Sequence, residues 1–362
     1  MLRPKGRISS IPLYHPPLAG RDGLRLDFNE NTVGCSPRVL DRLRQISFED
    51  LARYPEKACA ERKMAEFLGV SDAELLLTNG TDEAIHLLCQ TYLEAGDKAL
   101  IVVPTYSMYR IYMMAAGAHV ISVPMGANFE FPFAALADAV TDRTRLIAIA
   151  NPNNPTGTFA PIDQLLTLAK SAPQAAILID EAYFEFCGKS ALDKRREHSN
   201  LFVARTFSKA YGLAGLRLGA LIGDLDQMST LRRVCSPYNV NSVALSCLPV
   251  ALEDREFVEN YVSEILESRR RLQDALQTSG IAYWPSDANF VLMRAGTTRG
   301  DSILFTEQMR ARGILVRDRS ADHGCEGCVR ITLGPKQHTD QLLDALHESL
   351  KEFTITQGTP TQ

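Results

Sequence analysis

The sequence predicts an α/β protein with a large domain, built on a mostly parallel sheet covered by helices, and a smaller α+β domain. Short runs of almost uniformly apolar residues recur between residues 74 and 204, and helical segments follow them. Strands that are apolar on both faces are typical of parallel sheets buried under helices. From about Asp254 the pattern changes to one long amphipathic helix followed by short strands. A length of 362 residues also favours two domains over one.

Residues 1–40 are predicted to form an N-terminal arm with a strand that joins the small domain. Residues 24–28 alternate between apolar and polar, and they end in the polar cluster Asn29-Glu30-Asn31, which is either a plain turn or the rim of a pocket. Helices are expected at residues 37–44 and, after the loop Arg53-Tyr54-Pro55, as far as about residue 68.

Residues 41–253 are predicted to form the large domain. Strands are expected at 74–78, 99–103, 119–123, 146–150, 175–179 and 201–204. Helices are expected at 84–93, from just after Tyr106 to residue 114, and at 162–170. In such sheets ligands bind beyond the carboxyl ends of the strands. We therefore expect the polar residues that follow these strands to meet in one site: Thr81, Tyr106, Asn154, Asp180, Tyr183 and Lys209.

The small domain is expected over residues 254–362. A long amphipathic helix opens it, strands follow at 288–293, 314–317 and 329–333, and helices at 302–312 and 339–353. Arg317 and Arg330 each fall on a short strand. They are either solvated edge charges or a clamp for a carboxylate, which arginine binds through two hydrogen bonds.

Lys209 is the central candidate for chemistry. The apolar run 201–204 leads into Thr206, Ser208 and Lys209. Burial favours the neutral form of an amine, and a neutral amine forms a Schiff base with an aldehyde. The two hydroxyls, with Arg217, could hold a phosphate. An aldehyde and a phosphate on one small molecule suggest pyridoxal 5'-phosphate (PLP).

A second anion site is expected where Gly80 and Thr81 open a helix. The unpaired backbone N–H groups of a helix N-terminus and the helix dipole favour a negative charge there. The plainer interpretation is a helix cap by Asn79 or Thr81, and the two roles are compatible.

Other site classes are disfavoured. Asp180 could be a Mg²⁺ ligand of a nucleotidase, but Gly188-Lys189-Ser190 lacks the upstream glycine of a P-loop, and no Gly-x-Gly-x-x-Gly follows a strand. Cys325-Glu326-Gly327-Cys328 with His323 lacks the second ligand pair of a structural zinc site. We therefore expect no metal, and interpret this segment as a loop before a strand.

Composition points to an ordinary globular protein. The hydrophobic fraction is 45%, the charged fraction 23% and the net charge −4, which gives no reason to expect nucleic acid or an anionic membrane as a partner. No apolar run approaches the roughly 20 residues of a membrane span, and residues 1–10 do not resemble a secretory signal. The eight cysteines are expected to be free thiols in a reducing, cytoplasmic environment.

Several motifs together resemble a known family. Fold-type I PLP enzymes of the class I/II aminotransferases, which share the aspartate-aminotransferase-like fold, have segments similar to Asn154-Pro155-Thr156-Gly157, Asp180-Glu181-Ala182-Tyr183 and Thr206-Phe207-Ser208-Lys209 with Arg217. The histidinol-phosphate aminotransferase branch has segments similar to Leu26-Asp27-Phe28-Asn29-Glu30-Asn31, Arg53-Tyr54-Pro55, Gly80-Thr81-Asp82-Glu83, Pro104-Thr105-Tyr106, Pro237-Tyr238-Asn239-Val240-Asn241 and Val329-Arg330-Ile331-Thr332-Leu333-Gly334. The resemblance covers nearly the whole chain.

The resemblance implies a role for each residue around the cofactor. Lys209 would carry the internal aldimine, Asp180 would pair with the pyridine nitrogen, Asn154 and Tyr183 would bind the phenolic oxygen, and Tyr106 would stack on the ring. The implied phosphate contacts come from Gly80, Thr81, Asp82, Thr206, Ser208 and Arg217.

The resemblance also implies a homodimer and a substrate site. Tyr54 would reach the phosphate in the neighbouring subunit. Arg330 would hold the anionic end of the substrate, and Arg317, Tyr14 and Asn29 would complete that site.

The expected reaction is transfer of an amino group from histidinol phosphate to 2-oxoglutarate. The sequence departs from the branch at Pro335-Lys336-Gln337 and at Tyr14-His15-Pro16-Pro17, which both border the substrate. Three alternatives therefore stay open: an aromatic or other amino-acid aminotransferase, a decarboxylase of the threonine-phosphate type, and a PLP-binding regulator without turnover. The complete catalytic set disfavours the regulator.

Overall fold

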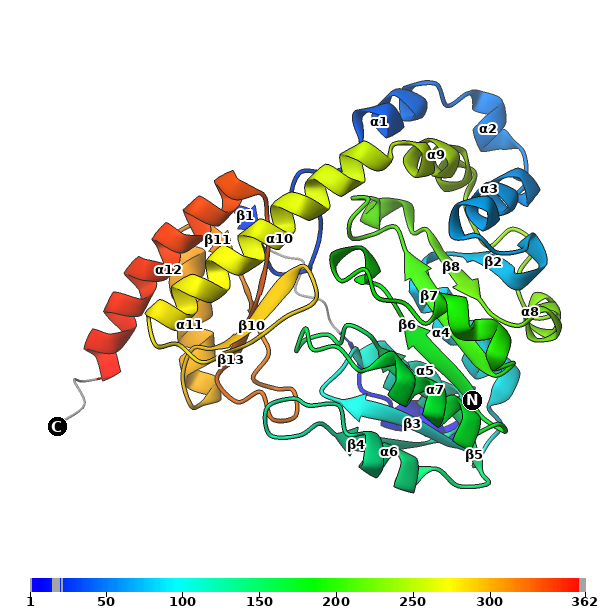
Figure 1. Ribbon diagram of the computed structural model, residues 1–362, viewed down its shortest axis with the longest axis horizontal. Coiled ribbons are helices and arrows are strands. Elements are labelled where there is room, and N and C mark those ends of the chain that lie inside the picture. The colour runs from blue at the N-terminus through cyan, green and yellow to red at the C-terminus, as the bar shows by residue number, and fades with distance from the viewer. Residues whose placement is uncertain (1, 15–19, 21, 358–362) are drawn as a thin grey trace.

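A seven-stranded sheet forms the centre of the larger part of the molecule (Figure 1). The structure is a computed structural model that describes residues 2–14, 20 and 22–357, so His15, Pro16 and Pro17 lie outside the described residues. The strand order is β2-β8-β7-β6-β5-β3-β4. The strands are β2 (Leu75–Thr78), β3 (Lys98–Val103), β4 (His119–Pro124), β5 (Thr144–Ala150), β6 (Ala176–Asp180), β7 (Leu201–Thr206) and β8 (Gly219–Ile222).

The predicted mostly parallel sheet is confirmed, with one strand that the sequence did not indicate. β8 runs antiparallel to both of its neighbours, β2 and β7. The other neighbouring pairs, from β7 to β4, are parallel. Because β8 is antiparallel on both sides, β2 points the same way as β7, and its carboxyl end lies at the same edge of the sheet.

Helices cover both faces of this sheet. Along β2, Leu75 and Leu77 face one hydrophobic cluster and Leu76 faces another, as the two-residue repeat of a strand requires. The first cluster includes α3 (Ala58–Leu68) and α7 (Ile162–Ser171). The second includes α4 (Gly80–Tyr92), α5 (Ser107–Ala116) and α8 (Leu225–Arg232). The sheet is therefore apolar on both sides, and polar residues collect at its ends.

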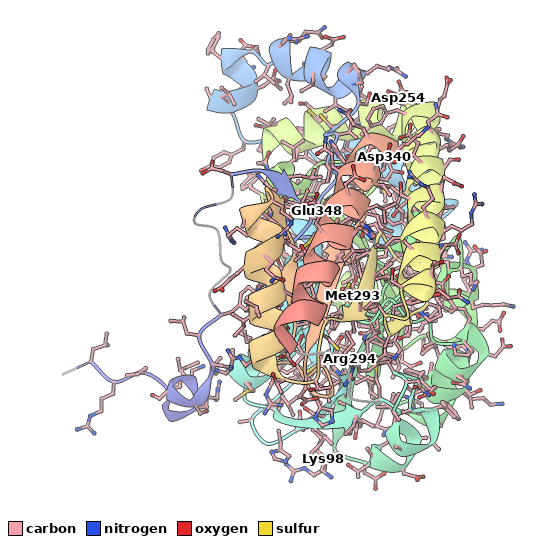
Figure 2. All side chains as sticks on the ribbon, turned by 90° about the vertical axis from the view of Figure 1, so that its left-hand side faces the viewer. Lys98, Asp254, Met293, Arg294, Asp340 and Glu348 are labelled. Carbon is pink, nitrogen blue, oxygen red and sulfur yellow. The ribbon has the colours of Figure 1, made fainter. Side chains whose placement is uncertain are left out.

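A smaller antiparallel sheet lies at the other end of the molecule. Its order is β12-β13-β10-β9, with β9 (Tyr283–Trp284), β10 (Phe290–Arg294), β12 (Arg317–Asp318) and β13 (Cys328–Thr332). The long helix α10 (Arg255–Thr278) connects the two parts (Figure 1). In Figure 2, α10, α11 (Arg299–Ala311) and α12 (Lys336–Gln357) lie side by side over this sheet.

Two predicted strands differ from the observed ones. The strand expected at 24–28 is limited to β1 (Leu24–Arg25), because the chain then turns and the carbonyl of Leu26 accepts a 2.9 Å hydrogen bond from Thr332 N. The strand expected at 314–317 is divided between two sheets. β11 (Ile314–Leu315) pairs in parallel with β1, while β12 pairs with β13. The pairing of β1 with β11 ties the N-terminal segment to the smaller part.

The remaining helices pack mainly around the larger part. They are α1 (Pro37–Arg44), α2 (Phe48–Ala52), α6 (Phe133–Ala139) and α9 (Ser242–Glu253). α1 begins where the sequence predicts, and the Ser36 hydroxyl caps it by accepting a hydrogen bond from Arg38 N. Within the described part of the chain, no helix is long and apolar enough to cross a membrane.

Candidate active site

Five strands of the large sheet end at one edge and deliver predicted site residues there. β3, β5, β6 and β7 are parallel, and β2 points the same way through β8. The residues at or just beyond these strand ends are Thr81, Tyr106, Asn154, Asp180 and Lys209. Asn154 accepts a hydrogen bond from Arg330 of the small sheet, so the candidate site lies between the two sheets.

Lys209 follows β7 after a short turn. Its Nζ atom donates a hydrogen bond to the carbonyl oxygen of Phe28, 3.3 Å away. Burial of the amine, with the positive charges of Arg330 and Arg217, lowers the pKa of Lys209 to about 8, while Glu30 acts in the opposite direction. With this pKa, roughly a tenth of the Lys209 side chain is the neutral, nucleophilic amine at pH 7, far more than of a lysine in water.

Asp180 is the last residue of β6, next to β7 in the sheet. Its side chain is buried, and burial raises the pKa of the carboxyl to about 6 against the effect of two hydrogen bonds. The hydroxyl of Tyr109 donates to Oδ2 at 2.7 Å, and the backbone N–H of Ala182 donates to Oδ1 at 3.1 Å. These donors help to keep the buried carboxylate ionised.

Tyr109 is a site residue that the sequence reasoning missed. It is fully buried in α5, one turn after Tyr106, and the two rings meet edge to face with centroids 5.7 Å apart. The spacing of three residues puts both side chains on one face of the helix. That spacing was the available signal, since Tyr106 was already a candidate.

Arg330 joins the small sheet to the ends of the large one. From β13 its Nη1 atom donates to Asn154 Oδ1 at 2.5 Å, and its Nη2 atom donates to the carbonyl of Asp27 at 2.6 Å. Burial, with the charges of Arg319 and Arg317, lowers the pKa of Arg330 to about 9. Its Nε atom has no hydrogen-bond partner among the described residues.

Arg317 lies opposite Arg330 in the pairing of β12 with β13. Its guanidinium sits over the ring of Phe28, 5.3 Å from the centroid. The pKa of Arg317 is lowered by burial, while the nearby phenol of Tyr14 acts in the opposite direction. Tyr14 also contributes to raising the pKa of Tyr106. Arg317, Arg330 and Tyr14 therefore border one side of the site.

Tyr183 and Asn29 meet directly. The side-chain amide of Asn29 donates to the hydroxyl of Tyr183 at 2.9 Å. Tyr183 also packs edge to face on Phe290, with centroids 5.1 Å apart. Burial and Asp180 raise the pKa of Tyr183, against the effects of Arg330 and Asn29, so the phenol stays protonated.

An anion cradle surrounds the start of α4. The Asn79 side chain makes no capping hydrogen bond, so the expected cap by Asn79 is wrong, and the Glu83 carboxylate instead accepts from the backbone N–H of Asn79 at 2.6 Å. A Cβ atom on Gly80 would lie 2.5 Å from Arg217 Nη2, so only glycine lets the guanidinium approach this closely. Asp82 accepts hydrogen bonds from Arg217 at 3.2 Å and from Tyr106 at 2.9 Å.

The hydroxyls of Thr206 and Ser208 lie at the end of β7. They hydrogen-bond to each other at 3.0 Å, and both residues are buried. Arg217 adopts the left-handed conformation, with a φ of 54°, just before β8. The described geometry thus brings the predicted phosphate-binding residues to the ends of β2, β7 and β8.

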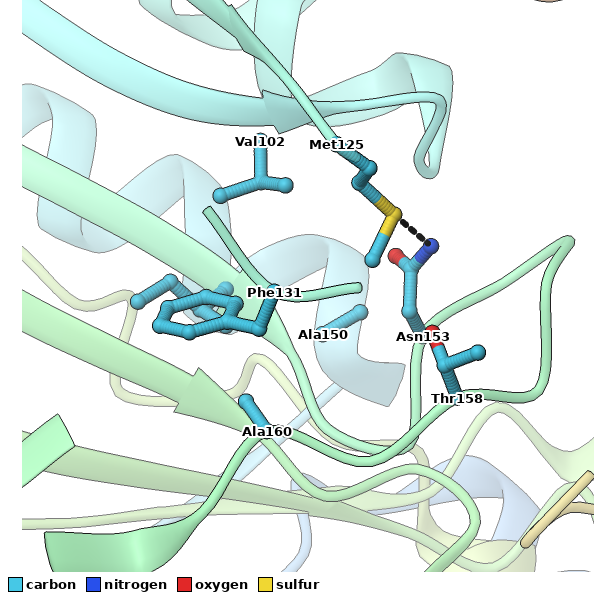
Figure 3. Close-up of a pocket in the computed structure, with 8 residues that line it drawn as sticks. Val102, Met125, Phe131, Ala150, Asn153, Thr158 and Ala160 are labelled. Atoms are coloured by element: carbon cyan, nitrogen blue, oxygen red, sulfur yellow. Dashed lines mark hydrogen bonds between the residues drawn. The ribbon is translucent and has the colours of Figure 1, made fainter. Parts of the chain in front are cut away.

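Asn153 fixes the loop that presents Asn154, and the sequence reasoning did not single it out. Its amide donates to the carbonyl of Pro104 and to the hydroxyl of Thr156, at 2.9 Å each. The amide also approaches the sulfur of Met125, beside a small, mainly apolar cavity (Figure 3). Its signal in the sequence was weak, because Asn153 and Asn154 are adjacent and either could have faced the ligand.

Tyr54 lies apart from the other predicted residues. It is 78% exposed and stacks on Tyr238, with centroids 4.3 Å apart. Exposed apolar side chains of Phe48 and Leu51 lie in α2, just before it in the chain.

Cys325 and Cys328 are buried, unpaired thiols in an apolar cluster with Phe129, Trp284 and Leu292. The segment is a loop that leads into β13, as the sequence predicts. Within the described ranges, no group of three potential metal ligands was found.

Comparison with known proteins gives one consistent result. The model of the family "Aminotransferase class I and II" matches residues 21–346. A histidinol-phosphate aminotransferase of Roseobacter denitrificans is 36% identical over 94% of this chain and 96% of that protein. Histidinol-phosphate aminotransferase 1 of Bacillus cereus is 33% identical over 91% of this chain and 89% of that protein.

A solved structure agrees at the level of the fold. The crystal structure of histidinol-phosphate aminotransferase from Sinorhizobium meliloti, in complex with pyridoxal-5'-phosphate, is 26% identical with a TM-score of 0.89 and covers 98% of this chain and 99% of that one. The family match spans both sheets and every strand end described above. The chain belongs to the class I and II aminotransferases.

Proposed function

We propose that this aminotransferase uses PLP to transfer the amino group of histidinol phosphate to 2-oxoglutarate. The observation that carries the proposal is the placement of Asp180 at the end of β6 and of Lys209 just beyond the end of β7, the adjacent parallel strand. One supplies a buried amine with a pKa of about 8, and the other a buried carboxyl with hydrogen bonds from Tyr109 and Ala182. An amine and a carboxylate in this arrangement suit the two ends of a pyridoxal ring.

The residues present fit the cofactor. The start of α4, where Asn79 makes no side-chain cap, the space at Gly80 and the charge of Arg217 would make a cradle for a phosphate, with Thr81, Asp82, Thr206 and Ser208 around it. Asn154 and Tyr183 would bind the phenolic oxygen, and Tyr106 would stack on the ring. When bound, PLP supplies an aldehyde for the amine and a ring that stabilises negative charge on carbon.

The chain's own groups would then move and hold the protons. Lys209 would accept the proton from the substrate Cα atom, for which a pKa near the working pH is suited. Asp180 would hold a proton on the ring nitrogen by its negative charge. The hydrogen bond from Tyr109 supports this role because it favours the ionised carboxylate.

Arginine charges favour a strongly anionic substrate. Arg330 and Arg317 lie opposite each other on neighbouring strands, and Arg319 adds to the positive charge felt by Arg330. An anionic group would relieve this repulsion and use the unpartnered Nε atom of Arg330. Histidinol phosphate and 2-oxoglutarate both offer such a group, and Tyr14 would contribute from the N-terminal arm.

The proposal includes a homodimer and a cytoplasmic location. A patch of exposed apolar side chains, formed by Phe48, Leu51, Tyr54 and Tyr238, suits burial against a second copy. Tyr54 would reach the phosphate in the partner's site. The eight unpaired cysteines are those expected in a reducing compartment.

The test is the visible spectrum of the PLP-bound protein while single amino donors are added without an acceptor. We expect histidinol phosphate at low concentration to change the spectrum rapidly and phenylalanine to have little effect. A preference for phenylalanine would move the enzyme to another amino donor. Release of CO₂ from threonine phosphate would indicate a decarboxylase.

The Lys209→Ala variant is the control for chemistry. We expect it to lose turnover with every donor, because it lacks the amine that captures the cofactor and moves the proton. Turnover near the wild-type rate in this variant would contradict the assignment of Lys209.

A further inference from the structure

We propose that Thr332 and Asn29 form a relay that points the hydroxyl proton of Tyr183 toward the phenolic oxygen of the cofactor, and so sets the pH at which the bound cofactor changes its absorbance. The proposal rests on the proposed function, since it assumes that Tyr183 faces the cofactor. It gives Asn29 a positioning role instead of a contact with the substrate.

The relay starts from a donor whose direction is fixed by the backbone. The N–H group of Asn29 donates to the hydroxyl oxygen of Thr332 at 3.0 Å. Thr332 Oγ1 in turn lies 3.1 Å from Asn29 Oδ1. A backbone amide cannot accept a hydrogen bond in return, so the hydroxyl proton of Thr332 is free to go to Asn29 Oδ1.

This contact fixes the orientation of the Asn29 amide. With its oxygen facing the Thr332 proton, its nitrogen faces the hydroxyl of Tyr183 at 2.9 Å. The NH₂ group of an amide only donates, so the Tyr183 oxygen must accept. The Tyr183 hydroxyl therefore does not donate its proton to Asn29, and the proton is available for a different acceptor.

The surroundings hold the relay in place. Asn29 is 1% exposed and Thr332 is fully buried, so water is a poor substitute for a lost partner. Asn289 donates to the carbonyl of Asn29 at 3.2 Å, and Asn29 has a φ of 54°, a conformation that asparagine tolerates better than most residues. Both polar groups of the Asn29 side chain are used within the relay, which leaves it poorly placed to bind a substrate.

The direction of the Tyr183 proton has a measurable consequence. The ring of Tyr183 lies with its centroid 5.9 Å from Lys209 Nζ, so its hydroxyl is near the group that captures the cofactor. A hydrogen bond to the phenolic oxygen stabilises negative charge there, and that charge is greatest after the chromophore has lost its proton. Loss of the bond should therefore raise the pH at which the absorbance changes.

The relay also connects the two parts of the protein. Thr332 and Arg330 both belong to β13, two residues apart and on the same face of the strand. A strand that would hold the substrate thus also orients a group that would bind the cofactor.

The experiment is a pH titration of the visible absorbance of the PLP-saturated protein. Tyr183→Phe, the reference variant, should shift the midpoint upward by about one pH unit, as expected for loss of one hydrogen bond to a charged group. Asn29→Asp should shift it in the same direction, because a carboxylate accepts the Tyr183 proton. Thr332→Val should do so without adding charge, and Thr332→Ser, which keeps the hydroxyl, should restore the wild-type midpoint.

Asn289→Ala is the matched control. It removes a buried hydrogen bond to the same residue, but to its carbonyl, so it should lower the thermal unfolding temperature and leave the absorbance midpoint unchanged. The relay is overturned if Thr332→Val titrates like the wild type while Tyr183→Phe shifts, or if Asn289→Ala shifts as much as Thr332→Val. An unshifted Tyr183→Phe would also overturn it. A wild-type protein that binds no PLP would overturn the proposed function itself.

Discussion

Asp180 illustrates how single residues set the chemistry of this site. Burial raises the pKa of its carboxyl to about 6, and the hydrogen bond from Tyr109 opposes that shift. Without the bond the folded protein would hold the carboxyl proton more tightly. The proposed function requires the ionised form beside the ring nitrogen, so Tyr109 should matter most at acidic pH.

We expect Tyr109→Phe to move the acidic limb of PLP binding upward by about one pH unit, the size expected for one charge-assisted hydrogen bond. The measurement is the dissociation constant of PLP for the apoprotein between about pH 5 and 8, where Asp180 titrates. The affinity for PLP should decrease as the pH is lowered. In the variant, the midpoint of this decrease should lie at a higher pH than in the wild type.

Tyr92→Phe is the matched control for this change. Tyr92 is a partly buried tyrosine in α4 whose hydroxyl donates to Gln227 at 2.8 Å, away from Asp180. Its loss should leave the acidic limb where it is. Equal curves for Tyr109→Phe and the wild type would mean that the hydrogen bond does not tune Asp180.

The sequence allowed the residues at strand ends to be predicted, and the reason is geometric. Lys209 and Asp180 follow apolar runs, and parallel strands end at one edge. Tyr109, which donates to Asp180, and Asn29, which donates to Tyr183, could not be assigned their partners in this way. Their roles depend on contacts between segments 71 and 154 residues apart, and no local pattern records such contacts.

At the scale of elements, Glu74 ties the short 3₁₀-helix Asp72–Glu74, which leads into β2, to the 3₁₀-helix Leu192–Glu197. Its carboxylate pairs with the buried Arg195 at 3.0 Å and with the exposed Arg196 at 3.3 Å. Burial alone would raise the pKa of Glu74, but the hydrogen bonds from Arg196, Ser71 and Arg195 outweigh it and lower the pKa to about 2. The stabilisation is therefore present above about pH 4.5, the value of a free glutamate, and is lost as the pH falls toward 2.

Glu74→Gln should lower the free energy of unfolding by about 3 kcal/mol at pH 7, because Arg195 is left as an unpaired buried charge. The measurement is a urea unfolding curve. The difference from the wild type should narrow as the pH is lowered toward 3. Arg196→Gln removes only the exposed partner and should cost less than about 1 kcal/mol. A Glu74→Gln variant as stable as the wild type would show that the pair adds nothing.

Elements were predicted best where hydrophobic periodicity is strong. The buried strands of the large sheet and the helix α1 appear close to their expected limits. Residues 314–317 were predicted as one strand, but their two halves belong to different sheets, because β1 arrives from the N-terminus to pair with the first half. The four-residue strand β8 was missed, since it follows a glycine-rich segment and is too short to show a period.

At the scale of the whole molecule, Tyr54 is exposed on the surface of the single chain, where it lies apart from the other predicted residues of that chain's own site. Tyr54 and Tyr238 stack on each other at the surface, next in the chain to the exposed side chains of α2. Rigid stacked aromatic rings are typical anchors of protein interfaces. If Tyr54 serves the site of a second copy, each site needs both chains, and this can be tested by mixing two defective proteins.

We expect a heterodimer of Lys209→Ala and Tyr54→Ala subunits to be active although each homodimer is impaired. The site that contains the intact Lys209 receives the intact Tyr54 from the other chain, while the second site loses both residues. In a dimer with two-fold symmetry, one wild-type site of two should restore about half of the wild-type rate. The measurement is the rate of the tag-purified heterodimer with histidinol phosphate and 2-oxoglutarate.

The outcome distinguishes the two possible positions of Tyr54. If Tyr54 acted within its own chain, the subunit with the intact Lys209 would still lack it, and the heterodimer would be no faster than the Tyr54→Ala homodimer. Mixing Tyr238→Ala with Lys209→Ala in the same way separates a direct contact of Tyr54 with the partner's site from a general contribution to the dimer interface. Tyr238 stacks on Tyr54, so its loss should weaken dimerisation measured by dilution, and heterodimers formed at high concentration should keep one working site. Activity of the heterodimer of Tyr54→Ala and Lys209→Ala, at protein concentrations at which the heterodimer of Tyr238→Ala and Lys209→Ala has dissociated, would therefore assign Tyr54 to the partner's site.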